Sequence, residues 1–276
     1  KWSNAVPGLE PERKATLNSG LAATTNLTEC LAIDQVALAK AVLPLTGLDA
    51  ALENVLAAQE KVASRGISHQ MPAIGVAIGE AVLDMPVRKA TVALDGLRHH
   101  VSDTVRSWAA FAVTRADAGL GLCARLDAAR PYAADTHFGV REWAWIAVRP
   151  YVAADVQGAI SILLAWTASS DPNVRRFASE SIRPRGVWCE HIALLKNHPE
   201  IAEPLLEALK ADDARYVQDS VANWLNDASK TSPEWVRELC KRWGREGVPA
   251  TDRIVGRALR TLRKKDRVVS DVEHQR

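Results

Sequence analysis

Apolar residues recur along the chain at the three- and four-residue spacing of amphipathic helices, and the alternating pattern of strands is nearly missing. Between residues 43 and 56 leucines follow one another every two to four positions, and Pro44 and Gly47 mark a break between two helices. Four further prolines are expected at a first helical turn, Pro86, Pro172, Pro199 and Pro233, and all except Pro86 directly follow a polar or capping-type residue. The pattern predicts an all-α protein of roughly a dozen or more helices, each about 10–16 residues long, with short connections.

A phrase recurs through the middle of the chain: a turn, then a helix start with Val and usually Arg, then small apolar residues. Its valines are Val87, Val105, Val140, Val174 and Val217, at intervals of 18, 35, 34 and 43 residues. The two middle intervals match a two-helix solenoid repeat of the HEAT or armadillo type. The alternative is chance recurrence in a chain rich in Val and Arg. The repeats predict a right-handed α-solenoid of HEAT-like helix pairs, with the second helix of each pair on the concave side.

Basic residues follow the valines of this phrase, although 35 Lys and Arg against 33 Asp and Glu leave a net charge of only +2. Stacked repeats would align them as a stripe of Arg88, Lys89, Arg106, Arg141, Arg175 and Arg176, followed by Arg183 and Arg185. We expect Arg88, Arg106, Arg141 and Arg175 to start successive inner helices. Such a stripe suits a polyanion, since phosphate contacts dominate affinity for nucleic acids. A peptide-binding groove is one alternative, and arginines that each pair with an acid inside their own repeat are another.

Nine of the fifteen aromatic residues are tryptophans, and five of them fall beside the basic stripe: Trp108, Trp143, Trp145, Trp188 and Trp224. Core packing explains about half of such residues. An indole on the polar side of a groove can instead stack on a base or lie over a cation. Three acids enter the same basic helices, Glu142, Glu180 and Asp227. They are either salt-bridge partners of the arginines or an anion that faces a positively charged substrate.

The remaining composition excludes several classes of protein. With 47 % hydrophobic and 25 % charged residues, the chain is not disordered, collagen-like or a disulfide scaffold. Its longest apolar stretch, at residues 159–168, is too short to span a bilayer, and we expect no secretory signal. The four cysteines form no C-x-x-C, and the pair Cys189 and His191 is too small a set to hold a metal. We expect a cytoplasmic protein with reduced cysteines.

Two longer strings are more specific. The first is V-R-R-F-A-S-E-S-I-R-P-R-G-V-W at residues 174–188, and the second is Y-V-Q-D-S-V-A-N-W-L-N-D-A-S-K at residues 216–230. Both resemble motifs of the HEAT-like AlkC/AlkD superfamily of DNA alkylation repair proteins. I-A-V-R-P-Y at residues 146–151 resembles a third phrase, A-I-R-P-F, of the AlkC branch, to which the likeness is closer. The specific part covers about residues 137–245. The resemblance implies a C-shaped DNA glycosylase with a basic concave groove, which excises positively charged alkylated bases and needs no metal or organic cofactor.

The resemblance also assigns roles to residues. Arg176, Glu180, Arg183, Trp188 and Asp227 occupy matching positions of the family motifs. The AlkC glutamate before the A-I-R-P phrase aligns with Trp145 or Ile146, so the nearest acid is Glu142, three residues earlier. Trp224 stands where the AlkC phrase has His, and Asn223 falls at the cleft tryptophan of the AlkD branch. The expected catalytic acid is Glu142, with Asp227 and Glu180 as rivals. Trp143, Trp145, Trp188 and Trp224 are expected to line the substrate cleft, and Arg106, Arg141, Arg175, Arg176, Arg183 and Arg185 to bind DNA.

These expectations define one HEAT-like repeat domain over residues 1–276. It comprises an N-terminal helical cap at 1–83, repeats with the family phrases at 84–245, and a basic C-terminal helix and tail at 246–276. The expected partner is double-stranded DNA carrying N3- or N7-alkylpurines or N3-methylcytosine, bound by a monomer associated with the nucleoid. Two alternatives to the glycosylase stay open: a family member that binds DNA without catalysis, and a HEAT scaffold for a protein partner.

Overall fold

The structure is a computed structural model that describes residues 9–274, with side chains up to residue 267. About 74 % of the chain is helical, and no strand occurs among the described residues, which confirms the predicted all-helical repeat fold. The chain divides into two compact units, residues 1–148 and 149–276. Residues 1–8 of the predicted cap and 275–276 of the predicted tail lie outside the described part.

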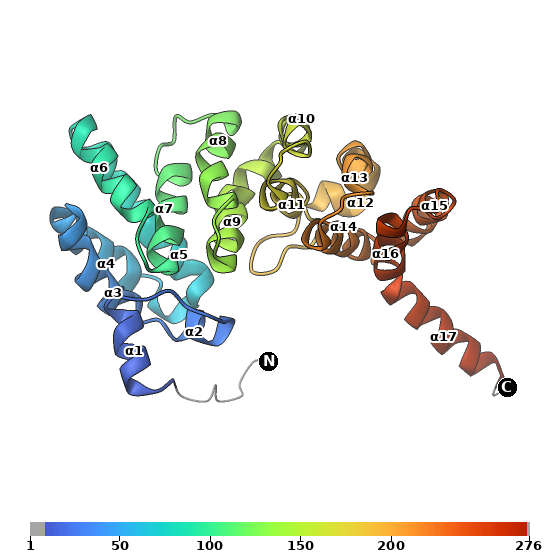
Figure 1. The fold of residues 1–276 in the computed structure, drawn as a ribbon, viewed down its shortest axis with the longest axis horizontal. Coiled ribbons are helices and arrows are strands. Elements are labelled where there is room, and N and C mark those ends of the chain that lie inside the picture. The colour runs from blue at the N-terminus through green and yellow to red at the C-terminus, as the bar shows by residue number, and fades with distance from the viewer. Residues whose placement is uncertain (1–8, 275–276) are drawn as a thin grey trace. The chain divides into compact units, whose positions relative to one another are not determined.

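The first unit contains helices joined by short turns and three 3₁₀ segments (Figure 1). The helices are α1 (Pro11–Asn18), α2 (Leu27–Ala32), α3 (Gln35–Val42), α4 (Leu52–Glu60), α5 (Ile67–Leu83), α6 (Val87–Arg98), α7 (Asp103–Arg115), α8 (Leu122–Ala133) and the first part of α9 (Phe138–Ala154). The 3₁₀ segments are η1 (Leu43–Thr46), η2 (Asp49–Ala51) and η3 (Ala63–Arg65). The predicted break lies at η1, which ends at Gly47 with a left-handed backbone, φ 76°.

The second unit begins near the end of α9 and continues the alternation of helices (Figure 1). Its helices are α10 (Val156–Trp166), α11 (Pro172–Glu180), α12 (Ala193–Asn197), α13 (Glu203–Leu209), α14 (Arg215–Ala228), α15 (Pro233–Gly244), α16 (Pro249–Ala258) and α17 (Arg260–His274), with η4 (Pro199–Ala202) before α13. Three of the four expected prolines start an element, since Pro172, Pro233 and Pro199 are the first residues of α11, α15 and η4.

Within each unit, equivalent helices pack along one another. In the first unit α5 lies along α7, and in the second α11 lies along α14 and α14 along α16. The first helix of each pair covers this row, as α6 does on α7 and α15 on α16. No helix in the described part of the chain combines the length and apolar character that crossing a membrane requires.

The recurring valine marks the start of the inner helices. Val105, Val140, Val174 and Val217 are each the third residue of their helix, and all four are buried. The expectation for the first phrase is wrong: Val87 begins α6, the outer helix of its pair, and is 83 % exposed. An interval of 18 residues spans one helix and one turn rather than a helix pair. Arg88 therefore does not start an inner helix.

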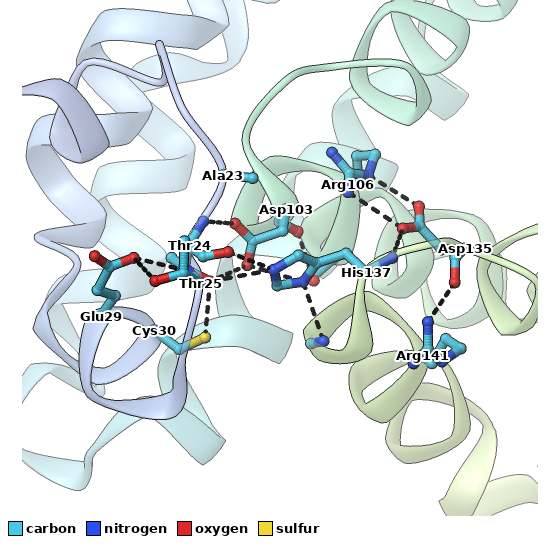
Figure 2. Close-up of polar contacts among 12 residues, drawn as sticks. Ala23, Thr24, Thr25, Glu29, Cys30, Asp103, Arg106, Asp135, His137 and Arg141 are labelled. Carbon is cyan, nitrogen blue, oxygen red and sulfur yellow. Dashed lines mark hydrogen bonds and ion pairs between the residues drawn. The ribbon is translucent and has the colours of Figure 1, made fainter. Parts of the chain in front are cut away.

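The segment around Thr24 is fastened to the starts of α7 and α9 (Figure 2). The buried carboxylate of Asp103, the first residue of α7, accepts hydrogen bonds from the Thr24 amide at 2.7 Å and from its hydroxyl at 2.9 Å. His137 Nε2 lies 2.7 Å from the Thr24 carbonyl oxygen. On either side, Arg13 donates to the Ala23 carbonyl, and Glu29 accepts from the Thr25 amide. This segment thus belongs to the fold rather than to a free N-terminal tail.

Candidate functional site

The arginines that follow the recurring valines bind loops of their own chain. Arg106 donates to the carbonyl oxygens of His100 and Val101 and forms a bidentate ion pair with Asp135, at 2.9 and 3.2 Å (Figure 2). Arg141 likewise donates to the carbonyl oxygens of Asp135 and Thr136.

Arg175 repeats the arrangement in the second unit. Its guanidinium donates to the carbonyl oxygens of Ser169 and Ser170 and pairs with Asp212 at 2.6 and 2.9 Å. Each of these arginines therefore binds the turn that precedes its own helix. Arg106 and Arg175 also bind the following turn, through ion pairs that are largely buried. Arg106 and Arg175 thus pair with acids of the following turn, and Arg141 binds carbonyl oxygens of the turn before its helix.

Most of the expected cleft tryptophans lie in the core. Trp143 and Trp145 are buried in the first unit, and Trp143 packs against the ring of Phe111 at 5.9 Å between ring centroids. Trp224 is fully buried in the second unit, where its indole N–H donates to the Ile182 carbonyl oxygen at 3.1 Å. Three of the four thus present no open face to a base in this structure.

Trp188 differs from the others, because 46 % of it is exposed. Its φ of 62° lies in the left-handed region, which a bulky residue rarely adopts without support from its surroundings. It belongs to the segment of residues 181–192 that connects α11 to α12, here called the α11–α12 loop. Within this loop the Ile192 amide donates to the Pro184 carbonyl oxygen at 3.1 Å.

Arg149 binds the backbone of the α11–α12 loop. The residue is buried, and its guanidinium donates to the carbonyl oxygens of Ser181, Arg183 and Glu190. Burial lowers the pKa of Arg149, but these three carbonyls satisfy its donors. The sequence analysis did not select this residue, although the I-A-V-R-P-Y string contains it. A buried arginine that binds only backbone carbonyls fixes the path of the loop that carries Arg183, Arg185 and Trp188.

A cluster of ionised groups lies between α11, this loop and α14. The Glu180 carboxylate is buried and accepts hydrogen bonds from the Arg183 guanidinium at 2.7 Å and from the Ser220 hydroxyl at 2.6 Å. Arg176 lies 3.5 Å from the same carboxylate and stacks on the Tyr216 ring at 4.4 Å. The cluster thus brings together three residues that the sequence analysis carried over from the family motif.

Asp227 completes the cluster on the side of α14. Arg183 donates to its Oδ2 atom from both Nε, at 3.0 Å, and a terminal nitrogen, at 2.6 Å. The other oxygen, Oδ1, accepts from the Lys230 ammonium at 3.0 Å. The Lys230 side chain is 44 % exposed. A ligand that displaced this ammonium would therefore reach one oxygen of an otherwise fixed carboxylate.

The neighbouring charges determine how the cluster titrates. Burial raises the pKa of Glu180, but the guanidinium groups of Arg176 and Arg183 and the Ser220 hydroxyl outweigh it and hold the pKa below its ordinary value. For Arg183, burial lowers the pKa, whereas Glu180 and Asp227 raise it by a larger amount. Glu180 is therefore an ionised structural partner that holds Arg183, and Arg183 in turn orients Asp227.

Glu142, the acid expected to be catalytic, belongs to the first unit. It lies on α9, and its Oε2 atom accepts a hydrogen bond from the Trp145 indole at 3.0 Å, one helical turn away. The cluster of the second unit contains the other two candidate acids, together with Arg183. The sequence analysis missed Lys230, although its spacing of three residues after Asp227 is a signal for an ion pair on one helix face.

Arg185 is part of the α11–α12 loop. Its Nε atom is buried without a hydrogen-bond partner among the described residues. Burial lowers the pKa of the nearby His191, and the positive charges of Lys196, Arg185 and Arg149 act in the same direction. Both Arg185 and Asp227 are therefore close enough to His191 for their charges to act on it.

The segment that contains this cluster matches a known family. Residues 136–253 match the model of the DNA alkylation repair enzyme family. Over 119 residues the chain is 45 % identical to the uncharacterized protein YhaZ of Bacillus subtilis, a match that covers 43 % of this chain and 33 % of the relative. The chain thus spans about a third of the length of the curated relative it matches.

Solved structures show that the likeness in fold extends beyond residues 136–253. The alkylpurine DNA glycosylase AlkC of Pseudomonas fluorescens, bound to DNA with an abasic-site analogue, is 24 % identical with a TM-score of 0.63, covering 92 % of this chain and 63 % of that one. AlkD2 of Streptococcus mutans is 22 % identical with a TM-score of 0.52, covering 66 % and 86 %. The protein smu.31 of Streptococcus mutans has 20 % identity and a TM-score of 0.55, covering 75 % and 96 %. The chain therefore has the AlkC/AlkD-like helical repeat fold, as the sequence motifs implied.

Proposed function

We propose that this chain is a DNA glycosylase that releases positively charged alkylated bases from duplex DNA by hydrolysis of the N-glycosidic bond. The observation that carries the proposal is the Asp227 carboxylate, which is fixed by Arg183 on one oxygen and covered by the half-exposed Lys230 on the other. The match of residues 136–253 to DNA alkylation repair enzymes supports it. N3- and N7-alkylpurines are the proposed substrates, with N3-methylcytosine as a further one.

The chemistry requires an anion and few other groups. Alkylation at N3 or N7 gives the base a positive charge, so the base leaves without prior protonation. Its departure makes the sugar resemble an oxocarbenium ion, which a fixed carboxylate stabilises while it orients the attacking water. Asp227 fits this role because two hydrogen bonds from Arg183 fix the orientation of its carboxylate.

The surrounding residues have separate proposed tasks. Trp188 is 46 % exposed on the α11–α12 loop, and an indole attracts a cationic base or sugar. Lys230 moves from Asp227 Oδ1 to a phosphate group when DNA binds, and Arg185 supplies further positive charge. Arg176 and Arg183, which the sequence analysis assigned to the DNA backbone, support the carboxylates in this proposal.

Single-turnover release of methylated bases from duplex DNA tests the proposal. The Asp227→Asn variant should release base at least about tenfold more slowly than the wild type, equivalent to roughly 1.4 kcal/mol of transition-state stabilisation. Its affinity for DNA should change little, because the lost interaction belongs to the transition state. The matched control is Asp252→Asn, which removes an exposed carboxylate from α16 of the same unit.

Glu142→Gln distinguishes the two candidate acids. If this variant loses activity while Asp227→Asn keeps it, the catalytic carboxylate is Glu142 and the assignment made here is wrong. If the wild type binds methylated DNA and releases no base, the chain is a DNA-binding member of the family without catalysis. Thermal melting of each variant separates a loss of chemistry from a loss of folded protein.

A further inference from the structure

One face of α14 carries three polar residues at intervals of one helical turn: Asp219, Asn223 and Asp227. Each of them contacts at least one arginine. Asp219 pairs with Arg253 at 2.8 Å and with Arg257 at 3.0 Å, and Asp227 pairs with Arg183. In the middle, the amide oxygen of Asn223 accepts from Arg260 at 3.0 Å. The row thus has carboxylates at both ends and a neutral amide between them.

Hydrogen bonds to uncharged acceptors consequently hold the Arg260 guanidinium in place without neutralising its positive charge. Its two hydrogen-bond acceptors are the Asn223 amide oxygen and the Arg257 carbonyl oxygen, at 3.0 and 2.8 Å, and it forms no ion pair within the described part of the chain. A guanidinium has five N–H donors, so these two bonds fix its direction and leave three donors available. Arg260 is the first residue of α17, and it is exposed to solvent.

The surroundings of Arg260 are positively charged. Burial of part of the side chain lowers its pKa, and the nearby charges of Arg257 and Arg183 act in the same direction, whereas only Asp227 opposes them. Arg260 thus lies close enough to the Asp227 cluster to be influenced by two of its members. An anion placed here would relieve the repulsion between these guanidinium groups and would meet donors that are already oriented.

We propose that Arg260 binds a backbone phosphate of the DNA whose lesion occupies the Asp227 site. The inference rests on the proposed function, because the glycosylase reaction places a nucleic-acid backbone beside Asp227. It adds a contact from α17, a helix that begins outside the segment matched by the family model. An arginine suits this task because its planar group donates two parallel hydrogen bonds to one phosphate.

Two variants test the contact from opposite directions. Arg260→Gln removes the positive charge, and Asn223→Asp keeps Arg260 but supplies the carboxylate that the row lacks in the middle. The probe is a fluorescent DNA duplex containing an abasic-site analogue, titrated by anisotropy at several salt concentrations. Both variants should reduce the slope of log affinity against log salt by about 0.9, the value for one phosphate contact. Asn223→Asp should melt no lower than the wild type, since it adds an ion pair.

Arg242→Gln is the matched control, because it also removes one positive charge, from an exposed arginine of α15 that pairs with Glu203. It should leave the slope unchanged. If Arg260→Gln and Asn223→Asp bind as the wild type does, or if Arg242→Gln reduces the slope equally, the proposed contact is wrong while the proposed function stands. If the wild type itself shows no salt-dependent DNA binding, the proposed function fails first.

Discussion

Replacing Glu180 by Gln should destabilise the second unit by about 2–4 kcal/mol. The substitution keeps the size of the side chain and removes only its charge. In the folded protein this charge is buried, and it lies against two guanidinium groups and one hydroxyl. A glutamine amide leaves Arg183 with one carboxylate, Asp227, instead of two, and it removes the carboxylate that lies 3.5 Å from Arg176.

The magnitude follows from the individual contacts. Removing one partner from a buried ion pair costs about 3–5 kcal/mol, because an unpaired charge remains in the interior. Here the cost is reduced, since the Gln carbonyl still accepts from Arg183 at the position of the present 2.7 Å bond and Asp227 still pairs with that arginine. The Ser220 hydroxyl, which donates to Glu180 at 2.6 Å, would have to turn and accept from the amide.

Urea denaturation followed by far-UV circular dichroism measures this loss. With a denaturant dependence of about 2 kcal/mol per molar urea, the midpoint should fall by roughly 1–2 M. The control is Glu238→Gln, an exposed glutamate of α15, which should change stability by no more than about 0.5 kcal/mol. If Glu180→Gln is as harmless as this control, the arginines do not depend on Glu180, and the order of support from Glu180 through Arg183 to Asp227 is refuted.

Two further predictions concern the first unit. Gly75→Ala should destabilise it by at least about 1–3 kcal/mol in thermal or urea unfolding. The new methyl group would overlap Phe111 and lie 2.7 Å from the Trp108 carbonyl oxygen, so α5 and α7 would have to separate. An unchanged unfolding midpoint would contradict this close approach of the two helices. Arg13 and burial act in opposite directions on Glu29, and Arg13 prevails, lowering the pKa of Glu29 to about 2 from 4.5. The stability this pair contributes is therefore complete above pH 4.5 and lost as the pH falls towards 2. The melting temperature of Glu29→Gln should accordingly depend less on pH over that interval than that of the wild type. A pH dependence parallel to that of the wild type would contradict this prediction.

The helical fold was predictable because each inner helix repeats the same local requirements. A buried valine at its third position and a polar turn before it recur in Val105, Val140, Val174 and Val217. The same pattern led to the wrong position for Val87. The phrase occurs at the starts of both inner and outer helices, so it does not reveal to which kind of helix a given copy belongs. Prolines inside helices were also not foreseen, and α9 continues through Pro150.

The candidate site was less predictable, because the chemistry of a charge depends on its distant partners. Arg175 and Arg183 look alike in sequence, yet one fastens a turn to Asp212 and the other orients Asp227. Burial separates the tryptophans in the same way, since Trp224 is enclosed and Trp188 is exposed. The motif resemblance identified Asp227 and Glu180, whereas Lys230 and Arg260 emerged only from their contacts in three dimensions.

The arginine that joins one turn to the next affects how freely the chain can vary. Arg106 and Asp135 are 29 residues apart, and Arg175 and Asp212 are 37 apart, yet both pairs form the same bidentate contact. Each pairing connects only the turns that precede two consecutive inner helices. The number of residues between those two turns is therefore open to change. In the second unit that additional length includes the α11–α12 loop. Insertions in this loop, around Trp188, therefore need not disturb the pairing of Arg175 with Asp212, so the stacking of the helices tolerates a loop of variable length at this position.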